Sequence, residues 1–227
     1  MRLGIGRDGG PSTKGRRASR GFQAAVEGME GRRLLTGSGA SIVLAGSTIE
    51  VTGTNLGDTG VVSMANGSVE VRVANAKGSD DVFFPASQVG SIEYFGGSGK
   101  NSFTNATSLT GHLNGGSGDN TLTGGSGIDF LVSTGGGANV LNAGSGFEVL
   151  EAMGTGTNTL NGGSGFDEML AFAGHNQFNG GSGYDFMIAV GGENVINAGS
   201  GYATVYSFSS TDVVHSNSGM TVYRFGG

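Results

Sequence analysis

The sequence of 227 residues contains no cysteine, which excludes disulfide bonds, thiol catalysis and metal sites built on cysteine. It has only two prolines, and its hydrophobic fraction of 36% is lower than a compact globular core usually carries. No stretch approaches the roughly 20 apolar residues that a membrane-spanning helix needs. Glycine, in contrast, is plentiful, with 48 residues and no period of three, so a collagen triple helix is also excluded.

Lysine and arginine are missing from most of the chain. Eight of the twelve lie in the first 33 residues, and none lies between Lys100 and Arg224. The same interval holds nine acidic residues. A surface that carries only negative charge repels phosphate, so we expect no nucleic-acid partner and a region suited to binding cations.

Two segments precede the periodic part of the chain. Residues 1–39 are basic, and we predict a mobile segment with one short helix around residues 21–35. Within it, the stretch from Met29 to Leu35, "MEGRRLL", resembles the LEPR-XLL motif near the N-terminus of many large bacterial extracellular proteins. Residues 40–95 alternate apolar and polar side chains between turn signals, which predicts a small region of short β-strands that caps the periodic part.

The chain is periodic over residues 96–215. Units of nine residues, with occasional tens, follow the pattern G-G-x-G-x-D-x-U-x, where U is a large apolar residue, and only residues 106–114 fit loosely. The apolar position recurs at Phe103, Leu113, Leu122, Leu131, Leu141, Leu150, Leu160, Met169, Phe178, Met187, Ile196, Val205 and Val214. Repeats of this kind indicate a solenoid in which each unit adds one slice of core. Residues 216–227 are then a C-terminal cap or tail.

If two units form one coil, residues 18 or 19 apart are neighbours in space, and alternate units fall into two series. One series carries asparagine at the sixth position, at Asn101, Asn120, Asn139, Asn158, Asn176 and Asn194, with Asp212 last. The other carries an acid, at Asp129, Glu148, Asp167 and Asp185, and ends at Ala203. We therefore expect an asparagine ladder on one edge and an acid row on the other, with glycine in both sets of turns because it tolerates positive φ.

The most regular units are "GGSGID" (124–129), "GGSGFD" (162–167) and "GGSGYD" (180–185). They resemble the RTX, or hemolysin-type, calcium-binding repeat, and the resemblance covers residues 96 to about 214. It implies an all-β fold, a parallel β-roll (a β-solenoid), with Ca²⁺ held between stacked turns of the same edge. The family generally occurs on secreted or cell-surface proteins.

The acid row itself also favours a bound cation. Neighbouring strands lie about 4.8 Å apart, where two carboxylates repel by roughly 3 kcal/mol at an effective dielectric of about 20. A hard divalent cation relieves this repulsion, and calcium accepts irregular oxygen cages that magnesium does not. The candidate metal-binding residues are the four acids with the turn residues Gly124, Ser126, Gly162, Ser164, Gly180 and Ser182. The alternative is a metal-free solenoid whose acids are solvated turn residues.

Two other rows of side chains are candidate binding surfaces. Beside the acids stand Ile128, Phe147, Phe166, Tyr184 and Tyr202, which form either a packing ladder or a sugar-binding platform. Alternation along the strands predicts an apolar outer surface at Leu170, Phe172, Ile188, Val190, Tyr206 and Phe208. This surface either docks a protein partner, a second copy or the N-terminal region, or is covered by residues 40–95 or the C-terminal tail.

The sequence gives little support for catalysis. The three histidines fall in different coils, and there is no nucleophile elbow, phosphate loop or zinc motif. Solenoid enzymes that act on acidic polysaccharides need basic residues, which residues 101–223 lack. We expect a non-enzymatic, extracellular, calcium-binding β-roll with a structural or adhesive role. The alternatives are a metal-free solenoid that binds proteins through its apolar face and, third, a polysaccharide-acting enzyme.

Overall fold

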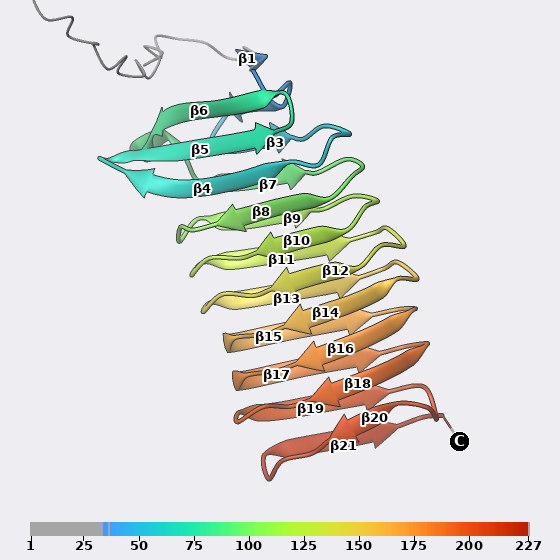
Figure 1. The fold of residues 1–227 in the computed structure, drawn as a ribbon. Coiled ribbons are helices and arrows are strands. Elements are labelled where there is room, and N and C mark those ends of the chain that lie inside the picture. Colours follow the sequence, from blue (N-terminus) through green and yellow to red (C-terminus); the bar gives the residue numbers. More distant parts are fainter. Residues whose placement is uncertain (1–33, 36, 227) are drawn as a thin grey trace, which may run out of the picture.

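Residues 34–35 and 37–226 are described by the computed structural model of the chain. They form a β-solenoid in which two sheets lie against each other along one axis (Figure 1). The described part contains no α-helix and a single 3-10 turn at Ala86–Gln88. The predicted all-β parallel roll with two units per coil is therefore confirmed. The predicted short helix and all of the LEPR-XLL-like stretch except Leu34–Leu35 lie outside the described residues.

The first sheet, sheet A, has eleven strands. Its strands from β11 to β19 each contain one position of the predicted acid row, from Asp129 to Ala203. Its strands, in spatial order, are β1 (Leu34–Leu35), β2 (Ser41–Ala45), β3 (Thr48–Thr52), β7 (Ser91–Phe95), β9 (Thr110–Asn114), β11 (Ile128–Ser133), β13 (Phe147–Ala152), β15 (Ser164–Ala171), β17 (Ser182–Ala189), β19 (Tyr202–Ser207) and β21 (Met220–Arg224). All pairs from β3 to β21 are parallel.

The second sheet, sheet B, has ten strands, and those from β8 to β18 begin at or just before the asparagine of each unit. Its strands, in spatial order, are β20 (Val213–His215), β18 (Glu193–Asn197), β16 (His175–Asn179), β14 (Thr157–Asn161), β12 (Asn139–Asn142), β10 (Asn120–Thr123), β8 (Asn101–Asn105), β4 (Thr59–Ala65), β5 (Ser68–Asn75) and β6 (Gly78–Pro85). Strands β4, β5 and β6 pair antiparallel, whereas β4 pairs parallel with β8. Parallel stacking thus begins within residues 40–95 and continues through β21.

The core is a column of apolar side chains between the two sheets. Because side chains alternate along a strand, each unit turns its large apolar residue inward and the neighbours on either side outward. Twelve of the thirteen repeated apolar residues are at most 1% exposed, and the last, Val214, is partly buried. Within the described residues, no helix has the length and hydropathy that a bilayer crossing demands.

The coils are not all of the same length. Residues 19 apart are paired between β13 and β15, where Glu148 lies beside Asp167, but residues 18 apart are paired between β15 and β17, where Asp167 lies beside Asp185. The difference arises on the asparagine edge, because four residues (153–156) connect β13 to β14 and three (172–174) connect β15 to β16. The strands keep their register on both sides of this shortened turn.

Candidate metal site

The four predicted acids are neighbours in sheet A. Asp129 pairs with Glu148, Glu148 with Asp167, and Asp167 with Asp185, and the row ends where Asp185 meets Ala203. Each acid points to the same side as the core residue two positions later, so all four side chains turn inward. They are at most 4% exposed. The acid row is thus a buried feature of the solenoid edge, and its members are not solvated turn residues.

Hydrogen bonding divides the row into two parts. Both carboxylate oxygens of Asp129 accept hydrogen bonds, Oδ1 from Asn105 Nδ2 at 2.8 Å and Oδ2 from the Gly125 amide at 2.7 Å. Glu148 accepts one bond through Oε1, from the Gly146 amide at 2.8 Å. In the described residues, no donor reaches Oε2 of Glu148 or either oxygen of Asp167 and Asp185. Unpartnered buried carboxylate oxygens are costly, so these five oxygens need a cation or protons.

The electrostatics of the three unpartnered acids agree with this need. Burial, reinforced by the neighbouring Glu148 and Asp185, raises the pKa of Asp167 to about 9. Burial raises the pKa of Asp185 to about 6, and it also raises the pKa values of Glu148 and Asp129. Without a cation, the middle of the row therefore holds a proton at neutral pH. A bound positive charge lowers these pKa values and replaces that proton.

The turn glycines bring backbone oxygens close to the carboxylates. Gly162 has room for no side chain, because a Cβ there would lie 2.5 Å from the Gly180 carbonyl oxygen and 2.9 Å from Asp167 Oδ2. A Cβ on Gly180 would likewise lie 2.6 Å from the Ala198 carbonyl oxygen and would also overlap Asp185 Oδ2. Carbonyl oxygens of the next coil thus converge on the same space as the carboxylate. Gly181 (φ 96°) and Gly183 (φ 126°) adopt backbone angles that favour glycine in these turns.

This oxygen set fits a hard divalent cation, and calcium in particular. No group of three or more Asp, Glu or His side chains suited to a metal occurs in the part of the chain that the structure describes. Each gap between coils therefore offers two carboxylates, and the remaining ligands would be backbone oxygens, which calcium accepts. Of the predicted turn residues, Gly124, Gly162 and Gly180 are buried beside an acid, whereas Ser126, Ser164 and Ser182 are exposed at the turn tips.

The opposite edge is closed by a hydrogen-bonded asparagine ladder. The Nδ2 of each asparagine donates to the Oδ1 of the asparagine in the next coil, over distances of 2.8–3.1 Å from Asn101 to Asn194. An aspartate lies at each end of the ladder. At one end the Nδ2 of Asn194 donates to Asp212 Oδ1 at 2.8 Å, and at the other the backbone amide of Asp58 donates to Asn101 Oδ1. The six side chains are buried and each has both donor and acceptor partners. Among the described residues of this edge, no buried carboxylate oxygen lacks a hydrogen-bond partner, so none calls for a cation.

Replacing Asn139 with alanine is expected to destabilise the fold by about 2 kcal/mol or more without changing the response to calcium. The substitution leaves the backbone amide of Asn120 and the Oδ1 of Asn158 without the partner that Asn139 provides, and buried unpaired groups cost about 1–3 kcal/mol each. Urea unfolding with and without calcium measures both effects. A smaller calcium-induced shift in this variant would contradict the assignment of the ion site to the acid edge alone.

Two features of the site could not be found by matching the repeat motif. Asn105, which closes the Asp129 end of the acid row, ends β8 directly before the loosely repeated segment and is held there by Thr107 Oγ1 and the Leu109 carbonyl. A second asparagine ladder runs along the outer side of sheet B, where the Nδ2 of each asparagine donates to the Oδ1 of the asparagine in the preceding coil, from Asn197 through Asn179 and Asn161 to Asn142. Its signal was the asparagine that comes directly after the repeated apolar residue in these units.

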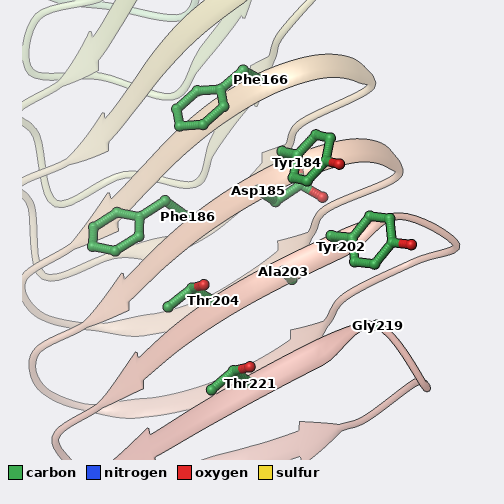
Figure 2. Close-up of a pocket in the computed structure, with 9 residues that line it drawn as sticks. All are labelled: Phe166, Tyr184, Asp185, Phe186, Tyr202, Ala203, Thr204, Gly219 and Thr221. Carbon is green, nitrogen blue, oxygen red and sulfur yellow. The ribbon is translucent and has the colours of Figure 1, made fainter.

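The row beside the acids is exposed and stacked. Figure 2 shows Tyr184 and Tyr202 one above the other at the turn edge, with Asp185 behind the strand. The rings of Tyr184 and Tyr202 lie 5.1 Å apart at 14°, and those of Phe147 and Phe166 lie 5.3 Å apart at 2°. In each of these two pairs, the rings pack face to face and cover one face of their neighbour. This geometry favours the packing ladder over the sugar-binding platform.

The six residues of the predicted apolar surface lie on the outer side of sheet A. Phe172, Val190 and Phe208 are 39–43% exposed, and Leu170, Ile188 and Tyr206 are half-buried among them. Residues 40–95 lie at the other end of the solenoid and do not cover them (Figure 1). Tyr223 of the C-terminal strand β21 and Phe225, which follows this strand, continue the surface.

Comparison with known proteins agrees with this geometry. Residues 112–131 and 154–187 match the family model of the RTX calcium-binding nonapeptide repeat, in four copies. No curated protein and no solved structure matches the chain. The matched ranges include Asp129, Asp167 and Asp185, so the repeats that carry these acids are similar to RTX calcium-binding repeats.

Proposed function

We propose that this chain, a β-solenoid with RTX calcium-binding repeats, binds calcium between the coils of its acid edge and that the ions lock the coils together. The observation that carries the proposal is the group of five buried, unpartnered carboxylate oxygens on Glu148, Asp167 and Asp185. Calcium supplies the positive charge that offsets the repulsion between these carboxylates. The chain's own residues supply two carboxylates per gap and the carbonyl oxygens of the glycine turns.

The four acids leave three gaps between neighbouring coils, and the hydrogen bonds favour ions in two of them. The Glu148/Asp167 and Asp167/Asp185 gaps each have unpartnered oxygens on both sides. In the Asp129/Glu148 gap, both oxygens of Asp129 already accept hydrogen bonds from within the chain. Any ion there must compete with those donors, so its affinity is lower.

We also propose an extracellular, non-enzymatic role, structural or adhesive. Binding in the ~0.1–1 mM range is typical of extracellular calcium modules, and calcium repeats of this type are generally found on secreted proteins. The histidines support a non-catalytic role, since His112, His175 and His215 lie on three separate strands. The pair of His175 Nδ1 and Glu193 Oε2, 3.4 Å apart, lies on the exposed side of sheet B.

A calcium titration tests the proposal. Adding calcium to about 10 mM is expected to raise the melting temperature of the metal-free chain, measured by far-UV circular dichroism, and magnesium is expected to do so far less because it requires a tight octahedron. Isothermal titration calorimetry of the same sample counts the ions, for which we expect two. No change in fold or melting temperature with calcium would falsify the calcium-locked roll and favour the metal-free solenoid.

A further inference from the structure

The outer side of sheet A ends in a broad apolar surface. Besides the six predicted residues it contains Phe186, Tyr223 and Phe225, and these nine residues together are called the apolar face. Figure 2 shows the neighbouring column of Phe186, Thr204 and Thr221 on the same side of the strands. A depression of about 260 Å³ in the face is lined only by apolar side chains: Phe186, Ile188, Val190, Tyr206 and Phe208.

The apolar face is pre-organised by ring contacts. Tyr206 stacks on Tyr223 at 4.9 Å, and Phe208 stacks on Phe225 at 4.8 Å. Phe186 contacts Tyr206 at 5.4 Å in a tilted arrangement. Aromatic side chains held in this way lose little conformational entropy when a partner covers them, so the face is suited to binding as it stands.

The chain's own N-terminal segment is a poor occupant for this face. It enters sheet A at β1, and eight strand steps of about 4.8 Å place β17 roughly 38 Å away. Even fully extended, residues 26–33 span less than about 30 Å, so Val26 and Met29 do not reach the face. Upstream of Val26 the segment offers four large apolar side chains, Met1, Leu3, Ile5 and Phe22, against the nine of the face.

We propose that two copies of this chain associate through their apolar faces, antiparallel, about a two-fold axis that runs along β17. In this arrangement β15 of one copy lies over β19 of the other, and β13 lies over β21. The strand registers then place Leu170 opposite Tyr206, and Ile188 opposite itself. Two sheets that pack face to face with aligned strands are a common arrangement in proteins.

The two acids on the outer side of these strands select this orientation. Glu168 lies opposite the Thr204 hydroxyl of the second copy, and Glu151 lies opposite the Tyr223 hydroxyl. Both carboxylates thereby meet a hydrogen-bond donor. With the two-fold axis along the solenoid through the same row instead, β15 would lie over β15 and Glu168 would be buried against Phe172, which offers no donor.

The size of the surface is sufficient for a specific dimer. The five strands β13 to β21 and three outward positions on each outline an area of about 24 Å by 20 Å. That outline is about 500 Å² on each copy before the relief of the side chains is counted, or roughly 1,000 Å² for the two copies together, which reaches the lower limit for a specific interface. Exposed apolar patches on monomers rarely exceed a few hundred Å².

Sedimentation of the full chain in calcium tests the proposal, with a matched pair of variants. We expect a dimer that forms as the concentration rises through the micromolar range. Val190, in the apolar face, and Val195, on the outer side of sheet B, are 39% and 40% exposed. Val190→Glu is expected to weaken dimerisation by about tenfold or more, because it places an unpaired charge in the interface, whereas Val195→Glu is expected to leave it unchanged.

Cross-linking tests the orientation. Because the chain has no cysteine, Ile188→Cys introduces a single thiol on the proposed axis. Facing sheets lie about 10 Å apart, which is too far for a direct disulfide, so a short bis-maleimide reagent is expected to link the two copies covalently. Val195→Cys is expected to remain uncross-linked. A wild-type chain that stays monomeric up to about 100 μM would overturn the proposal. So would a dimer that Val195→Glu disrupts as much as Val190→Glu, or one that Ile188→Cys does not cross-link. Dimerisation that appears only after deletion of residues 1–33 would assign the face to the chain's own N-terminal segment.

Discussion

Replacing Asp167 with asparagine is expected to remove most of the stabilisation that calcium gives to this chain. Asp167 is shared by the two gaps whose oxygens lack partners, so a single substitution leaves each gap with one carboxylate. At affinities of ~0.1–1 mM, calcium at about 10 mM stabilises a protein by about 1.4–2.7 kcal/mol per ion. Two ions therefore contribute about 3–5 kcal/mol, and the variant is expected to lose most of it.

The stability of this variant without calcium distinguishes loss of the ion site from general damage to the fold. The asparagine side chain is neutral, so the metal-free variant is expected to be at least as stable as the metal-free wild type, in which a carboxyl group with a pKa of about 9 is buried between two others. Asp119→Asn is the matched control, because Asp119 is an exposed acid on the asparagine edge. Urea unfolding with calcium and with a chelator measures both states. A calcium-induced shift in Asp167→Asn as large as that of the wild type would rule out the shared site.

The metal-free chain is expected to lose stability as the pH rises from about 4 to about 9. The folded-state pKa of Asp167 is raised from 3.8 to about 9, and that of Asp185 to about 6. A group whose pKa is raised on folding contributes fully below its unfolded pKa, and its contribution is lost as the pH rises through the folded value. The loss is on the order of 1.4 kcal/mol per pH unit for each carboxyl that must stay protonated.

Calcium is expected to flatten this pH dependence, because the ion stabilises the charged form of the same carboxylates. Thermal unfolding between about pH 4 and pH 9, followed by circular dichroism with calcium or with a chelator, gives the two profiles. A metal-free stability that rises across this range would show that the acid row is already compensated by groups in the chain. The Asp167→Asn profile is the control, since it should be flatter than that of the metal-free wild type.

The repeat made the coil and the acid row predictable from the sequence, because both depend on spacing alone. Residues 18 or 19 apart must be neighbours if two units form a coil, and that rule placed Asp129, Glu148, Asp167 and Asp185 side by side. It also placed the inward apolar residues, since a period of two sets which side chains face the core.

The contacts that spacing could not predict depend on irregular segments. The hydrogen bond from Asn105 to Asp129 requires the turn 105–110, which does not follow the motif, so no period links the two residues. Strands β3 and β4 join the parallel stack although neither carries the glycine motif. Pairing of parallel strands needs only backbone groups and a complementary core, so a solenoid can extend beyond its recognisable repeats.

The asparagine ladder also has a consequence for how the coil length varies. Between Asn139 and Asn158 the ladder spans 19 residues, and between Asn158 and Asn176 it spans 18, yet both bonds form, at 2.9 Å and 2.8 Å. Each ladder bond fixes the position of one asparagine per coil relative to the next coil. A residue gained or lost in a turn therefore changes the conformation of that turn alone and does not change the pairing register of the later strands. We therefore expect a one-residue insertion or deletion in a turn of this edge to cost less stability than the loss of a ladder asparagine.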